Sequence, residues 1–109
     1  MTLDFPDWAN PIEPGQFQLS GQGVRLVAAT GTPVALRAST IVKTVMIKAR
    51  AANVGTVYLG SSTVTNDENV NTGGLQLARG DMVTFAETDL AHVYINGTLG
   101  DGVSFAYWA

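Results

Sequence analysis

The chain contains no cysteine, and this absence excludes several kinds of chemistry. Without cysteine the fold has no disulfide bond, no thiolate metal site and no cysteine nucleophile, so packing alone must hold it together. Charge is also scarce, since only 14% of the 109 residues are charged and the net charge is -3. A chain with few basic residues has little attraction for phosphate groups, so we expect neither nucleic-acid binding nor attachment to a membrane.

A long apolar run and an N-terminal targeting signal are absent as well. The first ten residues, MTLDFPDWAN, contain acidic residues and proline where a secretion signal needs basic residues followed by an apolar run. Lys43, Thr44 and Lys48 interrupt the longest apolar stretch well before the ~20 residues that span a bilayer. We therefore expect a soluble protein of a single domain, which is what 109 residues have room for.

The composition changes once along the chain. The first 22 residues contain three of the four prolines, and proline removes amide donors and favours extended backbone. We therefore expect an extended N-terminal arm over residues 1–22 and a β domain over residues 23–109. The arm has four large apolar side chains and no core in which to bury them: Phe5, Trp8, Ile12 and Phe17. They either cover a sheet edge of the same chain or anchor the arm to another subunit, and we predict that they are partner-binding anchors.

After Gly23, apolar residues alternate with polar ones and the pattern stops at Gly, Pro, Asn or Asp, as in short antiparallel strands. In the longest candidate strand, Val45, Ile47 and Ala49 fall on one face, which should be the buried face. The expected strands cover residues 24–29, 34–38, 41–50, 56–59, 76–78, 82–87, 92–96 and 103–108. About eight such strands predict an all-β fold, an antiparallel β-sandwich that is jelly-roll-like or another Greek key, with no helix.

The predicted turns contain residues that tolerate unusual backbone geometry. We expect Asn53-Val54-Gly55 to use positive φ and Arg79-Gly80-Asp81 to be a hairpin turn. A glycine-rich reversal is expected over residues 96–102. The residues that we expect the backbone to need at turns are Asn53, Gly55, Gly60, Gly74, Gly80, Gly97 and Gly100.

Catalytic patterns are missing from the sequence. His92 is the only histidine, and the strand pattern places it on the face of Leu90 and Tyr94, which favours a packed or edge position over a catalytic base. No G-x-S-x-G sequence accompanies it. We predict that the protein is not an enzyme and uses no cofactor.

Three binding motifs are weaker alternatives. Asp67 and Glu68, in a loop rich in Asn, offer oxygen ligands for calcium, but their spacing matches no known calcium loop. Residues 79–81 match an integrin-binding tripeptide, which the turn geometry explains on its own. Exposed aromatic residues could stack on sugars, although two neighbours in one strand alternate faces, so at least one of them packs inward. The aromatic candidates are Tyr58, Tyr94, Tyr107 and Trp108.

Four short patterns stand out in the second half of the chain. They are V-x-I-x-A at residues 45–49, N-x-G-T-V-Y-L-G at 53–60, G-x-x-L-x-x-G-D at 74–81, and V-Y-I-N-G-T followed by G-D-x-V-S at 93–104. Together these patterns resemble small virion proteins of tailed bacteriophages over roughly residues 41–107.

The resemblance implies a capsid decoration or cement protein, which is a β-sandwich that oligomerises on the outside of the phage head and clamps neighbouring subunits. It implies the major capsid protein as partner and a homo-oligomer, with a trimer favoured over a dimer, at the exterior of the capsid in the virion. Two alternatives stay open, namely a head-fibre or tail component and a carbohydrate-binding module.

Overall fold

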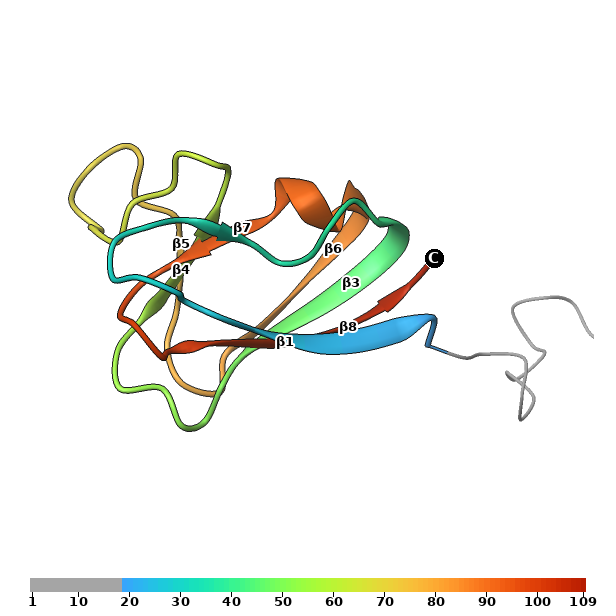
Figure 1. Cartoon of the computed structure of the whole chain (residues 1–109), viewed down its shortest axis with the longest axis horizontal. Coiled ribbons are helices and arrows are strands. Elements are labelled where there is room, and N and C mark those ends of the chain that lie inside the picture. The colour runs from blue at the N-terminus through green and yellow to red at the C-terminus, as the bar shows by residue number, and fades with distance from the viewer. Residues whose placement is uncertain (1–18) are drawn as a thin grey trace, which may run out of the picture.

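Two antiparallel four-stranded sheets pack face to face in the computed structural model, which describes residues 19–109 (Figure 1). The strands are β1 (Gly21–Leu26), β2 (Val34–Ala35), β3 (Ile41–Ala49), β4 (Val57–Gly60), β5 (Leu75–Leu77), β6 (Met82–Asp89), β7 (Tyr94–Asn96) and β8 (Gly102–Trp108). Sheet A has the order β1-β8-β3-β6, and sheet B has the order β2-β7-β4-β5. The expected all-β antiparallel sandwich is therefore confirmed.

The strand pairing is nested around the connection between β4 and β5. β4 pairs with β5, β3 with β6, β2 with β7 and β1 with β8, all antiparallel. Two further pairs, β3 with β8 and β4 with β7, complete the sheets. Because β4 and β5 are the only consecutive strands that share a sheet, every other connection crosses from one sheet to the other. Residues far apart in the sequence are thereby brought to the same surface.

The core lies between the sheets, where the inward side of each strand is apolar. In β3 the predicted alternation holds, since Val45, Ile47 and Ala49 are fully buried. Burial of such side chains is the main favourable term in folding. The core consists of Val27, Leu36, Val42, Val45, Ile47, Ala49, Val57, Leu59, Leu77, Leu90, Ile95, Val103, Phe105 and Tyr107.

The strand predicted at residues 92–96 is wrong at its start. A three-residue 3-10 turn, η2 (Leu90–His92), precedes β7, so the strand begins at Tyr94. The Asp89 side chain accepts a hydrogen bond from Ala91 N and caps this turn, which ends the strand pairing of β6. Within residues 19–109 no helix has the length and apolar character that crossing a membrane requires.

The hairpin predicted at Arg79-Gly80-Asp81 is also wrong. A turn is present, since Asp81 N donates to Ala78 O at 2.9 Å and Gly80 has a φ of 84°. However, this turn joins β5 of sheet B to β6 of sheet A instead of joining two paired strands. Local turn chemistry does not reveal which sheet the next strand enters.

Positive φ at Asn53 or Gly55, which the sequence suggested, does not occur. Asn53 is buried, and its side-chain amide donates to Gly102 O at 2.9 Å while its Oδ1 accepts from Gly102 N at 2.8 Å. Gly55 N donates to Asp101 Oδ2 at 2.8 Å. Hydrogen bonds between side chains and the backbone near the start of β8 therefore fix this loop. Positive φ at Asn53 or Gly55 is not needed.

Candidate interaction surface

The outer face of sheet A is a four-stranded surface made by the outward side chains of β1, β8, β3 and β6. Side chains on the outward positions of the strands form it, and Lys48 is the only charged one. We define the outer face of sheet A as Gln22, Val24, Leu26, Thr44, Met46, Lys48, Met82, Thr84, Ala86, Ser104, Ala106 and Trp108.

Strand register places these side chains in continuous rows. Met46 of β3 is opposite Ala106 of β8 on one side and Thr84 of β6 on the other. Thr44 is likewise opposite Trp108 and Ala86. Because residues directly opposite each other in antiparallel strands point to the same side, the rows form one surface.

Large apolar side chains on this surface face solvent. Val24 and Met82 are each 58% exposed, and Leu26 is 42% exposed. A sheet that faces water usually alternates apolar residues inside with polar residues outside, and this face departs from that rule. Val24 and Met82 are the two ends of one row, with Ser104 and Lys48 between them. Apolar side chains exposed together on one sheet face commonly mark a site of protein contact. The arrangement can therefore bind a flat protein surface by burial, without any chemical step.

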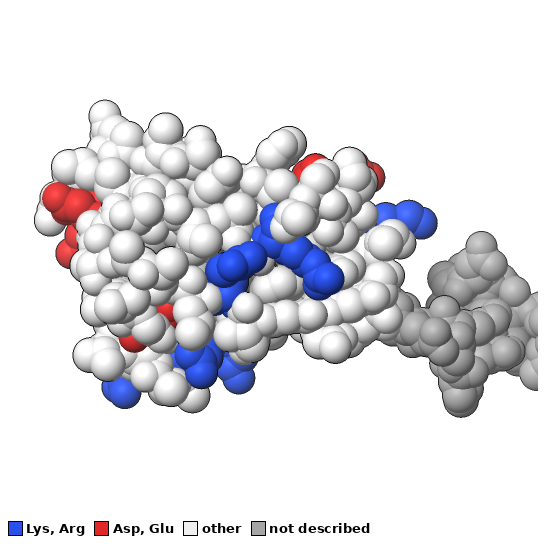
Figure 2. Space-filling model, in the orientation of Figure 1, with Lys and Arg blue, Asp and Glu red and all other residues white. Residues whose placement is uncertain are grey.

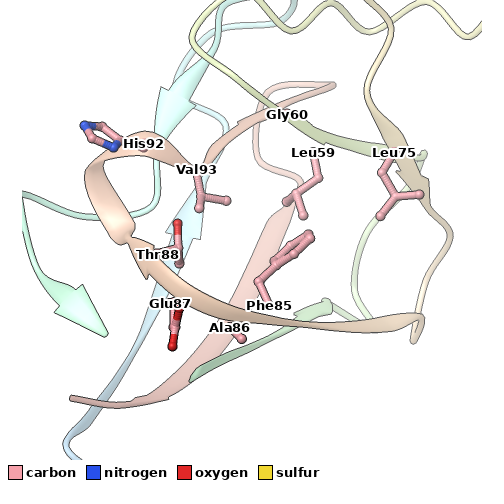
Figure 3. Close-up of a pocket in the computed structure, with 9 residues that line it drawn as sticks. All are labelled: Leu59, Gly60, Leu75, Phe85, Ala86, Glu87, Thr88, His92 and Val93. Atoms are coloured by element: carbon pink, nitrogen blue, oxygen red, sulfur yellow. The ribbon is translucent and has the colours of Figure 1, made fainter. Parts of the chain in front are cut away.

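A shallow hollow of about 400 Å³ lies on another side of the sandwich, where β5 and β6 are the edge strands (Figure 3). Leu59, Leu75 and Phe85 point toward one another inside it, whereas the His92 imidazole points away. β5 has only three residues and covers the core poorly here, so Leu75 stays 51% exposed. The hollow is a largely apolar gap at a sheet edge, with Glu87, Thr88 and His92 as the polar residues of its lining.

Glu87, on the rim of the hollow, interrupts β6. It is the only non-glycine residue of the described part with positive φ, at 48°. The register passes from the pair Val42–Thr88 to the pair Thr44–Ala86 without a Lys43–Glu87 pair. A distortion of this kind in an edge strand impedes pairing with a strand from another molecule. We therefore do not expect partners to add a strand at β6.

His92 is exposed at the end of η2, whereas Leu90 is fully buried, so the prediction that they share a face is wrong. Beside them, the Asp89 carboxylate accepts hydrogen bonds from Ala91 N, Ser39 Oγ and Thr40 N at 2.7–3.0 Å. These bonds, that from Ala91 first, lower the pKa of Asp89, with a smaller contribution from the charge of His92. Asp89 is thus a structural joint between β6, η2 and the start of β3.

The four aromatic residues considered for a sugar platform do not lie together on one surface. Tyr107 is buried and stacks on Phe105, with ring centroids 6.4 Å apart, so the expected inward packing of one of the pair is confirmed. Trp108 lies on the outer face of sheet A, whereas Tyr58 and Tyr94 lie on neighbouring strands of sheet B. Tyr58 is opposite Asn96 and Tyr94 is opposite Gly60, so these two rings point to the same outer side of sheet B. The four rings are therefore not on one surface, and only Tyr58 and Tyr94 share one.

The acidic loop considered for calcium has a local structural role. Asp67 Oδ1 accepts a hydrogen bond from Asn69 N at 2.9 Å, which is an Asx turn. No group of three or more His, Asp or Glu side chains within residues 19–109 is arranged to hold a metal ion.

The predicted turn glycines serve different needs. Gly80 and Gly100 have φ of 84° and 89°, a backbone conformation that favours glycine, and nothing lies near their missing Cβ. Gly60 and Gly74 instead allow close packing, against the Val64 side chain and the Leu59 carbonyl respectively. Gly97 is close to extended backbone and lies against Thr56 O.

The predicted anchors Phe5, Trp8, Ile12 and Phe17 lie outside the described residues. The sequence prediction also missed the outer face of sheet A. The signal that identifies it is the apolar character of the outward positions in β1 and β3, namely Val24, Leu26 and Met46. Comparison with protein-family models, with curated proteins and with solved structures found no match to this chain.

Proposed function

We propose that this protein is a structural virion protein of a tailed bacteriophage. In this proposal it binds the outside of the capsid as an oligomer and clamps neighbouring subunits of the major capsid protein. The observation that carries the proposal is the outer face of sheet A, where eleven of twelve side chains are uncharged and several apolar ones are exposed. A surface of this composition suits permanent contact with protein better than it suits water.

The strand order supports the fold that the resemblance implies. Sheets of order β1-β8-β3-β6 and β2-β7-β4-β5, nested around the β4–β5 connection, are what a jelly roll of eight strands requires. We therefore propose the jelly-roll form of the sandwich. Fold alone does not determine function, so this agreement adds to the surface argument without replacing it.

Clamping needs no chemistry. A protein that binds the assembled shell better than free capsid subunits stabilises the shell by linkage. In the proposed arrangement the outer face of sheet A lies on the shell, and the apolar side chains Phe5, Trp8, Ile12 and Phe17 anchor the N-terminal segment to a neighbouring capsid subunit. Several such contacts within one oligomer act at high effective concentration, so each can be weak on its own.

The test is direct binding of the purified protein to phage heads that lack it. We expect the protein to sediment with the heads in a saturable manner, at a fixed number of copies per capsid subunit. Protein that stays in the supernatant while it binds isolated fibres, tails or glycans would instead support the fibre or sugar-binding alternatives.

A further inference from the structure

Charge is divided unevenly between the first 18 residues and the sandwich. The chain has six basic and nine acidic residues in total. Three of the acidic residues, Asp4, Asp7 and Glu13, fall within residues 1–18, which contain no Lys or Arg. Residues 19–109 therefore have six basic and six acidic residues, and the net charge of -3 comes entirely from the N-terminal segment.

Two arginines lie on the side of the sandwich where β1 and β2 are the edge strands. Arg25 Nε, from β1, donates a hydrogen bond to Leu36 O at 3.1 Å, just after β2. The guanidinium carbon of Arg37 lies 5.9 Å from the centroid of the Tyr107 ring. We call Arg25 and Arg37 the arginine pair. Within residues 19–109 their guanidinium partners are a carbonyl and a ring, so neither arginine is neutralised by a carboxylate.

Basic side chains gather in the middle of the surface that Figure 2 presents, where Figure 1 draws β1 and the segment after β2. Arg37 is exposed and Arg25 is partly buried. An arginine presents a rigid fork of donors that binds carboxylates through paired hydrogen bonds, so this surface is suited to acidic side chains.

The Tyr107 ring beneath Arg37 is held in place by close packing against β1. Gly21 and Gly23 of β1 leave space for two rings of β8, since a Cβ on these glycines would lie 2.5 Å from the Tyr107 hydroxyl and 2.8 Å from Phe105 Cζ. Arg37 lies over the Tyr107 ring, within the range of a cation–π contact. A guanidinium that is already held in place loses less side-chain entropy when it binds.

The N-terminal segment joins the sandwich close to this site. Ser20 N donates to Tyr107 O at 2.8 Å, and Ala109 N donates to Ser20 Oγ at 2.7 Å. Residues 1–18 are therefore connected to the sandwich beside the same tyrosine over which Arg37 lies. In an oligomer with adjacent copies, an acidic segment and an arginine pair are repeated together around the assembly.

We propose that the arginine pair of one copy binds the acidic N-terminal segment, Asp4 to Glu13, of a neighbouring copy. The occupant is a second copy because this segment carries the whole excess of negative charge, and an oligomer repeats it next to each arginine pair. Each acid is also next to a predicted anchor, as in Asp4-Phe5, Asp7-Trp8 and Ile12-Glu13. The inference rests on the proposed function only for the assembly of copies into an oligomer.

The test uses two full-length variants with opposite charge changes. The acceptor variant combines Arg25→Gln, which keeps a donor for Leu36 O, with Arg37→Glu at the exposed position. The donor variant combines Asp4→Lys, Asp7→Lys and Glu13→Lys. A control variant, Arg50→Gln with Arg79→Glu, makes the same change of charge as the acceptor variant but at positions outside the arginine pair. Thermal unfolding checks that all of them are folded.

Molar mass is measured by light scattering over a range of concentrations. We expect the wild type and the control to form the oligomer, and the acceptor and donor variants each to need about tenfold more protein or higher to associate, as expected for lost charge-assisted hydrogen bonds. An equal mixture of acceptor and donor variants should associate at a lower protein concentration than either variant alone, because contacts between unlike copies join a segment and a site of opposite charge.

A monomeric wild type, variants that associate like the wild type, a control that loses association, or a mixture no heavier than its components would each overturn the inference. No phage heads are present in this experiment. Normal association together with failure to bind heads would therefore contradict the proposed function and leave the inference standing.

Discussion

At the scale of single residues, a few polar side chains with buried partners determine how the loops meet the sheets. Asn53 satisfies both backbone groups of Gly102, and Asp101 accepts from Val54 N and Gly55 N. Both side chains are almost fully buried, at 2% and 3% exposure. Buried polar groups that lose their partner cost more than the hydrogen bond contributes, so these positions should be sensitive to substitution.

Asn53→Ala should lower the free energy of unfolding by about 1–3 kcal/mol, because it removes two buried hydrogen bonds and takes from Gly102 N its Asn53 acceptor, while Gly102 O keeps the bond from Arg50 N. Urea denaturation measures this loss. Asn71→Ala, at an exposed position in the 61–74 loop, is the matched control and should change stability by less than about 0.5 kcal/mol. Equal stabilities for the two variants would show that the Asn53 bonds are not needed.

Asp89 should make the free energy of unfolding depend on pH. Its pKa is lowered in the folded state, so its contribution is complete above the pKa of an unfolded aspartate and is lost as pH falls through the lower, folded pKa. Asp89→Asn should therefore be less stable than the wild type near neutral pH and should lose less stability on acidification. Ser39→Ala, which removes one of the three donors, should give an intermediate slope. Chemical denaturation at a series of pH values measures these slopes, and identical slopes would contradict the assignment.

At the scale of elements, side chains alternate between the two sides of sheet A, and substitutions on the two sides should have different effects. The inward positions of β3 are core, whereas the outward positions belong to the outer face of sheet A. Lysine at an exposed outward position should therefore be tolerated by the fold and harm only binding.

Val24→Lys with Met82→Lys should keep a cooperative unfolding transition and weaken binding to heads by about tenfold or more, because both residues lie on the proposed contact surface. Val54→Lys is the control, since Val54 is 89% exposed in a loop outside that surface. Sedimentation with heads measures all three substitutions. Head binding that survives the double substitution would remove the outer face of sheet A from the contact.

Alternation and turn residues were enough to predict eight strands in the right order, because buried and exposed positions alternate along most of them. Their bounds were less accurate, since β1 is Gly21–Leu26 where 24–29 was predicted and β2 is Val34–Ala35 where 34–38 was predicted. These local signals were not enough to predict features that long-range contacts determine, such as the sheet that a strand joins. The turn at Gly80 looks like a hairpin locally, but β5 and β6 are directed into different sheets by pairing with β4 and β3. The start of β7 was misplaced because the Asp89 cap competes with the strand.

The candidate surface was harder to predict than the strands. The apolar residues at outward positions look like core residues in the sequence, and only the pairing of β3 with both β6 and β8 shows that they form one outer face. The arginine pair escaped notice for a similar reason, since Arg25 is held by Leu36 O and Arg37 lies over the Tyr107 ring, and both contacts are long-range.

At the scale of the whole molecule, the chain consists of an electrically neutral sandwich and a short acidic segment with large apolar side chains. Neutral sandwiches do not repel one another, which favours dense packing of copies on a surface. In the proposed oligomer the acidic side chains serve contacts between copies, and the apolar side chains serve contacts with the shell.

Trp8→Ala should weaken attachment to heads by about 2 kcal/mol or more, because large aromatic side chains dominate binding energy at interfaces. Occupancy of heads, measured by titration of the variant against heads that lack the protein, gives the affinity. Association of free copies should be unchanged, since the substitution keeps the acidic residues. Wild-type occupancy would mean that the anchors do not reach the shell.

The central claim is that the protein stabilises a capsid by covering it, and the most direct measurement is the survival of phage heads under heat and salt shock with and without the protein. Heads that lack it should lose their contents at a lower temperature and recover wild-type resistance when purified protein is added back. Heads that are equally resistant in its absence would contradict the claim.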